Sequence, residues 1–186
     1  MAQDFLINQF LIAMPSLKDP NFQQSVVYVC EHNADSALGI VINRPTPVVL
    51  GDIFKQLSIE ASDAQLVHRP VFQGGPVQME RGFVIHQPVG AWEATLKIGD
   101  NLGVTTSRDV LAAMARGEGP QNAFVALGYA GWSAGQLETE LSSNSWLSTP
   151  ADRSIIFETP VEQRWQAAAQ LIGVDIALLS GDAGHA

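Results

Sequence analysis

Residues 126–141 read ALGYAGWSAGQLETEL and decide how the rest of the chain is interpreted. The apolar run AFVALGYA (123–130) is typical of a strand, and the amphipathic stretch after the turn is typical of a helix. Strands and helices alternate with such turns elsewhere in the chain. The sequence therefore predicts a mixed α/β fold.

The turn in this stretch, GWSAG (131–135), matches the G-x-S-x-G pattern of serine hydrolases. A hydrolase also needs an acid and a histidine downstream, but the only downstream histidine is His185, beside the C-terminus. No HGGG-type oxyanion segment precedes the turn. Ser133 is better explained as a helix N-cap, with Gln136 reaching back to it and Trp132 packing on Leu137. Serine hydrolysis is thus the third choice of function.

The first half of the chain is rich in expected strands. We expect a short helix at 51–57, capped by Asp52, with Phe54 and Leu57 on one face. Proline stops the strand before RPTP (44–47), because it has no amide hydrogen to donate to a sheet. The hairpin signal Gly99-Asp100-Asn101 joins two of the strands. The strands are expected at 10–14, 25–30, 37–43, 69–77, 82–88, 93–98 and 102–106, with a Gly-Gly-Pro turn at 74–76.

The second half of the chain is marked by helix signals. Thr106 and Asp109 have capping-box spacing before a helix that Gly117 ends. Thr159-Pro160 opens another helix that runs to Gly173. Strands are expected at 123–130 and at SIIF (154–157). Hairpins imply antiparallel pairing, and strands separated by helices permit some parallel pairing. Helical spacing directs Val161, Trp165, Ala168 and Ile172 toward the core.

Composition limits the classes of function. The 186 residues, 46% of them hydrophobic, suit one globular domain covering 1–186. A net charge of −9, with only 10 Lys and Arg residues, argues against direct binding of nucleic acid or an acidic membrane surface. No apolar run is long enough to span a bilayer, and the N-terminus has no basic segment typical of a secretory signal. One cysteine fits a reducing cytoplasm. Nothing in the sequence indicates an oligomeric state.

Cys30 is the second candidate nucleophile. Residues two apart on a strand share a face, so Cys30, His32 and Tyr28 are expected on one side. A nearby imidazolium would favour the thiolate and a redox or sensing role. The alternative is that Cys30 is a small buried side chain, which is its commoner role. A zinc site is not supported, because no second cluster supplies further ligands.

A third set of candidates consists of polar and glycine residues near the ends of predicted strands and helices. Their similar positions are compatible with a shared ligand pocket. Gly-Gly could let backbone amides approach a ligand, and helix starts favour anions. Against this, the arginines can be solvated and the glycines can serve a simple turn. No phosphate-loop pattern is present, and no cofactor is indicated. The set comprises Arg44, Gly74, Gly75, Arg81, His86 and Arg108.

Several blocks together closely resemble the bacterial YqgE/AlgH family, from about Phe10 to the C-terminus. They are LIAMPSLKDPNFQQSVVYVCEHN, GIVINRP, QGGPV with RGFVIH, TTSRDVL, ALGYAGWSAGQLE and ADRSIIFETPVEQRWQAAAQLIGVD. The resemblance implies one α/β domain built on a curved, bulged, largely antiparallel sheet with flanking helices.

The resemblance also bears on function, although the biochemical role of this family is uncharacterised. Cys30-Glu31-His32 matches the family block, whereas Ser133 is not part of the family pattern, which agrees with a capping role. Members carry a transcriptional-regulator label, which the net charge does not support as direct DNA binding. We expect a cytoplasmic binding or regulatory protein, not an enzyme, with a small ligand or a protein partner. A thiol role of Cys30 is the alternative.

Overall fold

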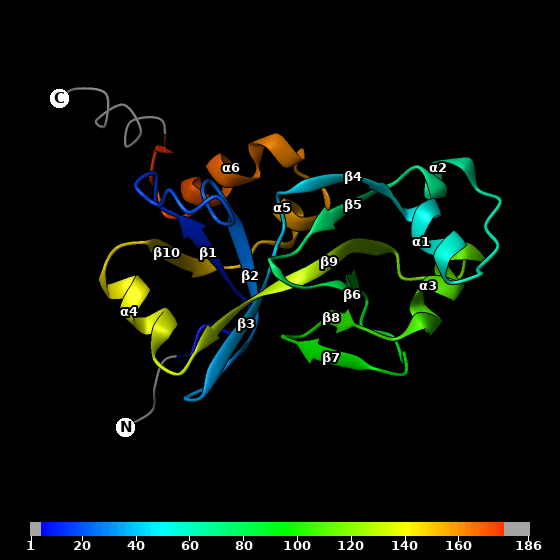
Figure 1. Cartoon of the computed structure of the whole chain (residues 1–186), viewed down its shortest axis with the longest axis horizontal. Helices are drawn as coiled ribbons and strands as arrows, with labels where there is room; N and C mark the ends of the chain where they lie inside the picture. Colours follow the sequence, from blue (N-terminus) through cyan, green and yellow to red (C-terminus); the bar gives the residue numbers. More distant parts are fainter. Residues whose placement is uncertain (1–4, 177–186) are drawn as a thin grey trace.

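The computed structural model describes residues 5–176 (Figure 1). Its strands are β1 (Gln9–Ala13), β2 (Val26–His32), β3 (Ser36–Val41), β4 (Pro45–Val49), β5 (Pro70–Gln73), β6 (Val77–Gln87), β7 (Thr95–Ile98), β8 (Leu102–Thr105), β9 (Asn122–Ser133) and β10 (Trp146–Pro150). Its helices are α1 (Leu50–Gln56), α2 (Ala64–Val67), α3 (Arg108–Ala115), α4 (Gln136–Ser142), α5 (Arg153–Phe157) and α6 (Arg164–Gln170), the last preceded by a 3₁₀ turn (Val161–Gln163).

The strands form one curled sheet in the order β10-β1-β2-β3-β9-β6-β8-β7, with every neighbour on this path antiparallel. β5 pairs parallel to β9 and antiparallel to β4. The predicted class, a curved and mostly antiparallel α/β fold with flanking helices, is confirmed. Figure 1 shows two halves: a β1–β3 half that also contains β10, α4 and α6, and a β6–β8 half that also contains β4, β5 and α1–α3.

β9 runs through both halves and joins them (Figure 1). Its last residues pair with β3, from Gly39↔Ala130 to Ser36↔Ser133. Its first residues pair with β6, from Gln87↔Asn122 to Gly82↔Leu127. Antiparallel hydrogen bonds on successive stretches of one long strand thus hold the two halves in a fixed register.

Gly74 and Gly75 lie directly against the middle of β9. A Cβ on Gly75 would sit 2.1 Å from the carbonyl carbon of Tyr129, and one on Gly74 would sit 2.3 Å from the Gly128 oxygen. Gly128 itself has φ of 79°, which L side chains rarely adopt. The expected close approach at Gly-Gly is present, but its partner is the protein's own backbone rather than a ligand.

A β-bulge in β2 changes which residues share a face. Val29 pairs with Gly39 and Glu31 with Leu38, so Cys30 is an extra residue. Tyr28 and Cys30 belong to one core cluster, whereas His32 pairs with Ala37, which belongs to another. The expectation that Cys30 and His32 share a face is therefore wrong.

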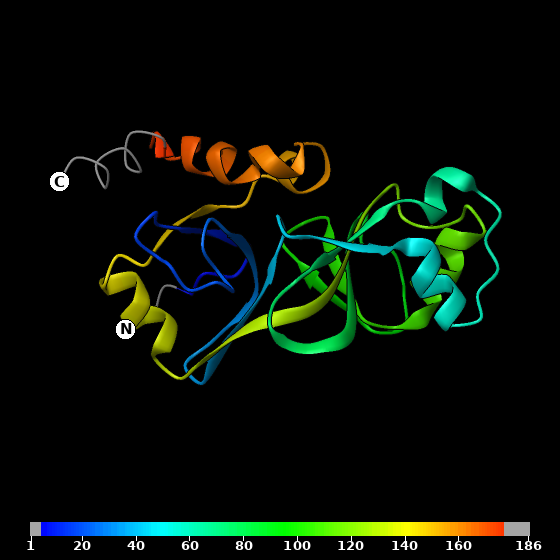
Figure 2. The same ribbon diagram turned by 45° about the horizontal axis from the view of Figure 1, so that its top comes forward.

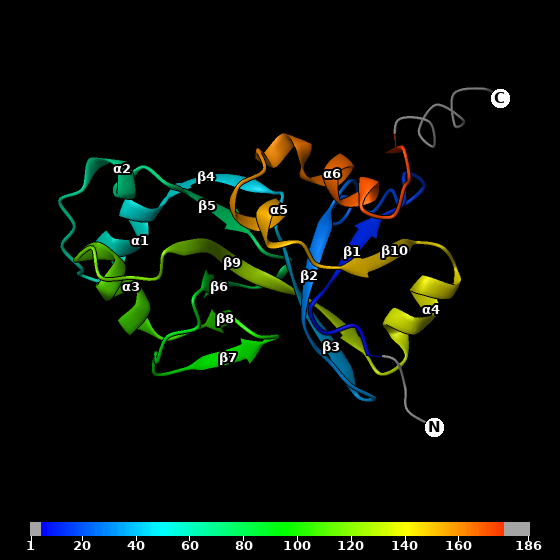
Figure 3. The ribbon, with the colours of Figure 1, turned by 180° about the vertical axis from the view of Figure 1, so that it is seen from behind.

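Helices cover the sheet in separate groups. α6 packs on β1 and β2, and α5 packs on β9, so both lie together over one side (Figures 2 and 3). α4 packs on the end of β9 and on β10. There the indole nitrogens of Trp132 and Trp146 both donate to Oε1 of Glu140, at 3.0 and 2.9 Å. These contacts tie α4 to two strands.

The capping predictions are correct about the helices and wrong about the cap residues. Ser133 ends β9, and Gly135, with φ of 74°, is the N-cap of α4. Gln136 Oε1 accepts from Ser133 N at 3.0 Å. Of the two hydrogen bonds of the expected capping box, the one from the Gln136 side chain forms, whereas the Ser133 hydroxyl does not cap the helix. Ser107 rather than Thr106 caps α3, and Asp52 lies at the third position of α1 after Val49. Each shift is one to three residues, which the side-chain pattern alone does not resolve.

Two element predictions are also corrected. SIIF lies in helix α5, because Asp152 Oδ1 accepts from Ser154 N at 2.9 Å and caps a helical turn. The strand β3 does end before RPTP, as expected, but a separate strand, β4, begins at Pro45 and pairs only with β5, an edge position that tolerates proline. α6 ends at Gln170, so Ile172 is 37% exposed rather than in the core. The strands β4 and β10 and the helix α2 have no counterpart among the expected elements.

We expect Gly75→Ala to destabilise the protein by more than about 3 kcal/mol, because the new methyl group would overlap the β9 backbone. Gly117→Ala is the matched control: its φ is 78° and no atom lies within 4 Å of the added Cβ, so only a backbone cost of about 1 kcal/mol is expected. Urea unfolding of both variants measures the difference. Equal losses would contradict the role of this contact.

Candidate functional site

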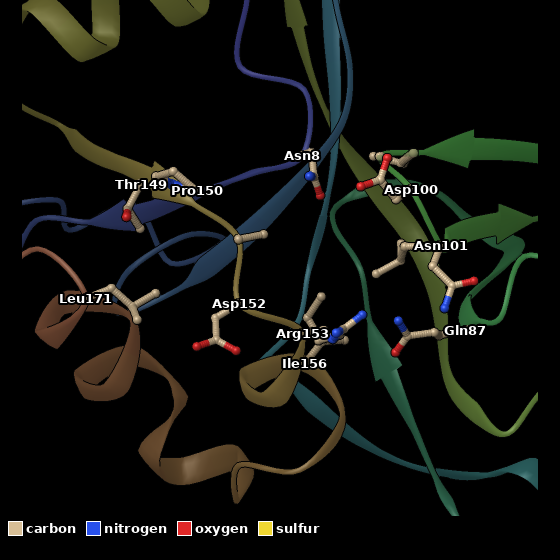
Figure 4. Close-up of a pocket in the computed structure, with 14 residues that line it drawn as sticks. Asn8, Gln87, Asp100, Asn101, Thr149, Pro150, Asp152, Arg153, Ile156 and Leu171 are labelled. Carbon is tan, nitrogen blue, oxygen red and sulfur yellow. The ribbon is translucent and has the colours of Figure 1, made fainter.

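A crevice of about 640 Å³ lies where the two halves meet (Figure 4). This volume is in the range of small-molecule sites. One wall comes from the β7–β8 turn and the end of β6, and the other from the ends of β1 and β10 together with α5. The lining residues are Asn8, Gln87, Ile98, Gly99, Asp100, Asn101, Leu102, Thr149, Pro150, Ala151, Asp152, Arg153, Ile156 and Leu171.

Asn8 holds the centre of the crevice in place. Its Oδ1 accepts from the Tyr28 hydroxyl at 2.8 Å, and its carbonyl accepts from Ala151 N at 3.1 Å. A Cβ on Gly99 would lie 3.2 Å from Asn8 Nδ2, so the hairpin turn of one half reaches the other half here. The crevice is thus built on backbone contacts rather than on loose loops.

Polar groups without assigned partners point into this crevice. Gln87 is only 9% exposed, and within residues 5–176 no hydrogen bond is assigned to its amide. Figure 4 shows the side chains of Gln87, Asn101 and Arg153 in one part of the crevice and the Asp100 carboxylate in another part, toward Asn8. An amide that faces a crevice can both donate and accept hydrogen bonds. The arrangement is suited to a ligand that both donates and accepts hydrogen bonds.

Sequence reasoning missed this crevice. Gly99-Asp100-Asn101 was interpreted only as a hairpin turn, and that interpretation is confirmed by the β7–β8 pairing. Gln87 ends an apolar strand, and Arg153 lies in a segment that was expected to precede a strand. The available signal was the run of Gly, Asp and Asn at a turn, which is commoner as simple turn chemistry.

The eight predicted site residues do not gather in one pocket. His86 is fully buried: its Nδ1 donates to the Pro88 carbonyl at 3.0 Å, and its Nε2 accepts from the Thr105 hydroxyl at 2.6 Å. Burial lowers the pKa of His86 below its usual value of 6.5, which favours the neutral ring. His86 therefore joins β6 to β8 within the core.

The three predicted arginines lie apart from one another. Arg44 is half-buried and donates to the Gln23 carbonyl at 2.8 Å. Arg108 donates to the Leu57 carbonyl at 3.0 Å beside a pocket of about 410 Å³ under α1 and α3. Arg81 is exposed and lies over the Phe83 ring, 5.2 Å from its centroid. Each has a local partner of its own.

Cys30 and Arg81 do line one cavity, of about 330 Å³. Cys30 is nevertheless only 3% exposed, and burial, together with the charge of Glu31, raises the pKa of its thiol. His32 faces away from it: Nδ1 accepts from Leu6 N at 2.9 Å, and Nε2 donates to Glu138 at 3.2 Å. The environment of Cys30 therefore favours the protonated, unreactive thiol.

Two further findings concern residues 5–176. No group of three or more His, Cys, Asp or Glu side chains is placed to hold a metal ion in this part of the chain. Across the same range, none of the helices has the length and apolar character needed to cross a bilayer. His185, the distant histidine considered for a hydrolase, lies outside the described residues.

Known proteins share this fold and sequence over nearly the whole chain. A UPF0301 protein of Thioalkalivibrio sulfidiphilus is 60% identical over 179 residues, which are 96% of each chain. A UPF0301 protein of Methylococcus capsulatus is 56% identical over 182 residues, 98% of this chain and 97% of its own. The solution structure of the AlgH protein from Pseudomonas aeruginosa matches with a TM-score of 0.81 at 47% identity and covers 97% of both chains.

A crystal structure of a Corynebacterium diphtheriae protein, at 16% identity and a TM-score of 0.75, shows the same fold alone. The fold and the long sequence matches define one class of bacterial protein. The family model described as AlgH-like matches residues 10–177, and the chain belongs to this family. The resemblance noted from the sequence blocks is confirmed.

We expect Cys30 to resist alkylation in the native protein at neutral pH, because its thiol is buried and its pKa is raised. Since it is the only cysteine, all incorporated label reports on this position. Mass spectrometry after iodoacetamide, with and without denaturant, measures the rate. Native labelling as fast as that of a free thiol would support a redox or sensing role instead.

Proposed function

We propose that this protein is a cytoplasmic binding protein that holds a small polar molecule in the crevice between its halves. The observation that carries the proposal is the crevice of about 640 Å³ itself, lined by the side chains of Gln87, Asn101 and Arg153, which have no assigned hydrogen-bond partner among residues 5–176. A ligand in the crevice could exchange hydrogen bonds with these groups in place of water.

The lining chemistry describes the ligand. Amide groups supply donors and acceptors, Arg153 supplies a cationic fork, and Ile98, Ile156 and Leu171 supply apolar walls. Such a mixture fits a hydroxyl- or amide-bearing molecule with an acidic group facing Arg153. Asp152 is engaged as the cap of α5, with Oδ1 accepting from the Ser154 amide and hydroxyl. These roles favour binding over catalysis.

A regulatory role would then be exerted through the ligand or a protein partner, without direct contact to DNA. The net charge of −9 repels phosphate backbones. We expect only weak, non-specific binding of duplex DNA at physiological salt. A fluorescence-anisotropy titration measures it, and sequence-selective binding with a steep salt dependence would reject this part of the proposal.

We expect a screen of sugars, amino acids and nucleosides by ¹H–¹⁵N NMR to find ligands that shift amide signals of residues 98–102 and 149–153. Gln87→Leu removes the amide while keeping a side chain of similar size, and Arg153→Gln removes the charge. Each should weaken binding about tenfold, the equivalent of one hydrogen bond to a polar or charged group.

Arg116→Gln is the matched control, because Arg116 is exposed, pairs with Glu118 at 3.2 Å and lies at the end of α3 outside the crevice lining. It should leave affinity unchanged. Ligand shifts that fall outside the crevice, or that persist in Gln87→Leu, would contradict the proposal.

A further inference from the structure

Arg164, at the start of α6, is a buried cation held by neutral groups. Arg164 is only 7% exposed. Nε donates to the Thr159 carbonyl at 2.9 Å, and Nη1 donates to the Ile42 carbonyl. The guanidinium also lies over two stacked rings, 5.3 Å from the centroid of Phe72 and 5.6 Å from that of Phe124. These contacts position the cation but do not neutralise it.

Arg164 is not in an ion pair within the described part of the chain, where the two side-chain pairs are His32–Glu138 and Arg116–Glu118. Burial lowers the pKa of Arg164 to about 10, against the opposing influence of Glu162. Buried charges are usually paired with an opposite charge, because desolvation is costly. In a chain with 19 acidic residues, a buried arginine without a carboxylate partner is unusual.

A second arginine lines the same space. Arg69, just before β5, donates through Nη2 to the Ala123 carbonyl at 2.6 Å, which leaves the rest of its fork free of assigned partners among residues 5–176. Arg69 and Arg164 both line a cavity of about 180 Å³ between β5, β9 and α5. No acidic residue is among the described residues lining it, which are Leu50, Arg69, Pro70, Phe72, Ala123, Phe124, Val125, Ile156, Phe157 and Arg164.

We propose that this cavity is a binding site for a small oxyanion, a phosphate or a carboxylate group, held between the guanidinium groups of Arg69 and Arg164. Arginine forks match such groups with paired hydrogen bonds. The volume lies below the range of sites for whole metabolites, which favours a free anion or one acidic group over a large ligand. Apolar and aromatic walls surround the Arg164 side of the cavity and strengthen the attraction there, whereas Arg69 lies at its solvent-exposed side.

This site is distinct from the crevice of the proposed function. Among residues 5–176, Ile156 of α5 is the one residue that lines both cavities. The anion site therefore does not depend on whether a polar molecule binds at Gln87.

The test is a titration of the full chain with sodium phosphate and, separately, sodium acetate, followed by ¹H–¹⁵N NMR at constant ionic strength set with sodium chloride. We expect saturable shifts at Arg69 and at residues 123–125 with at least one of the two anions. The anion with the higher affinity identifies the acidic group. Absence of saturable shifts with both anions would overturn the proposal.

Variants of Arg69 separate binding from structure, because this residue is exposed and its loss should not unfold the protein. Arg69→Gln should weaken the anion about tenfold, and Arg69→Lys, which keeps the charge but not the fork, should weaken it less. Arg116→Gln should have no effect. Equal affinity in wild type and Arg69→Gln would mean that Arg69 does not hold the anion, and the proposal would fail.

Discussion

The contact of Gly74 and Gly75 with the backbone of β9 is the constraint on which the rest of the structure depends. It allows β5 to run parallel to β9 on one edge while β6 pairs with the other edge. Farther along, the same strand pairs with β3. A side chain at either glycine would separate strands that must touch. The crevice and the arginine cavity both lie between elements that this junction holds together.

The fold was largely predictable where local chemistry and tertiary context agree. The β7–β8 hairpin and the amphipathic helix α3 have strong local signals and are present. SIIF shows the limit: its β-branched residues favour a strand, but the cap of Asp152 and the packing of Ile155 and Ile156 in the core select a helix. Local propensity is a weak guide where a capped turn competes with it.

The candidate sites were far less predictable, because their residues come from distant segments. Asn8, Gln87, Asn101 and Arg153 meet only after the two halves join on β9. Nothing in the sequence singles out Arg164, because arginine is rarely buried and the helical spacing there points to its apolar neighbours. Its burial follows from the end of β3 and the phenylalanine pair, which no local pattern reveals. Conversely, His86 is of a residue type that often serves in functional sites, but here it lies in the core and hydrogen-bonds to Pro88 and Thr105.

The bulge in β2 affects which changes of length the strand tolerates. Cys30 is the unpaired residue, so its deletion would leave the pairs Val29↔Gly39 and Glu31↔Leu38 adjacent and in phase. Deletion of a residue of β2 before the bulge, such as Val27 or Tyr28, would instead reverse the faces of the residues on one side of it. The bulge is therefore the place in β2 where a one-residue deletion keeps the pairing register, although it also removes a buried side chain from the core.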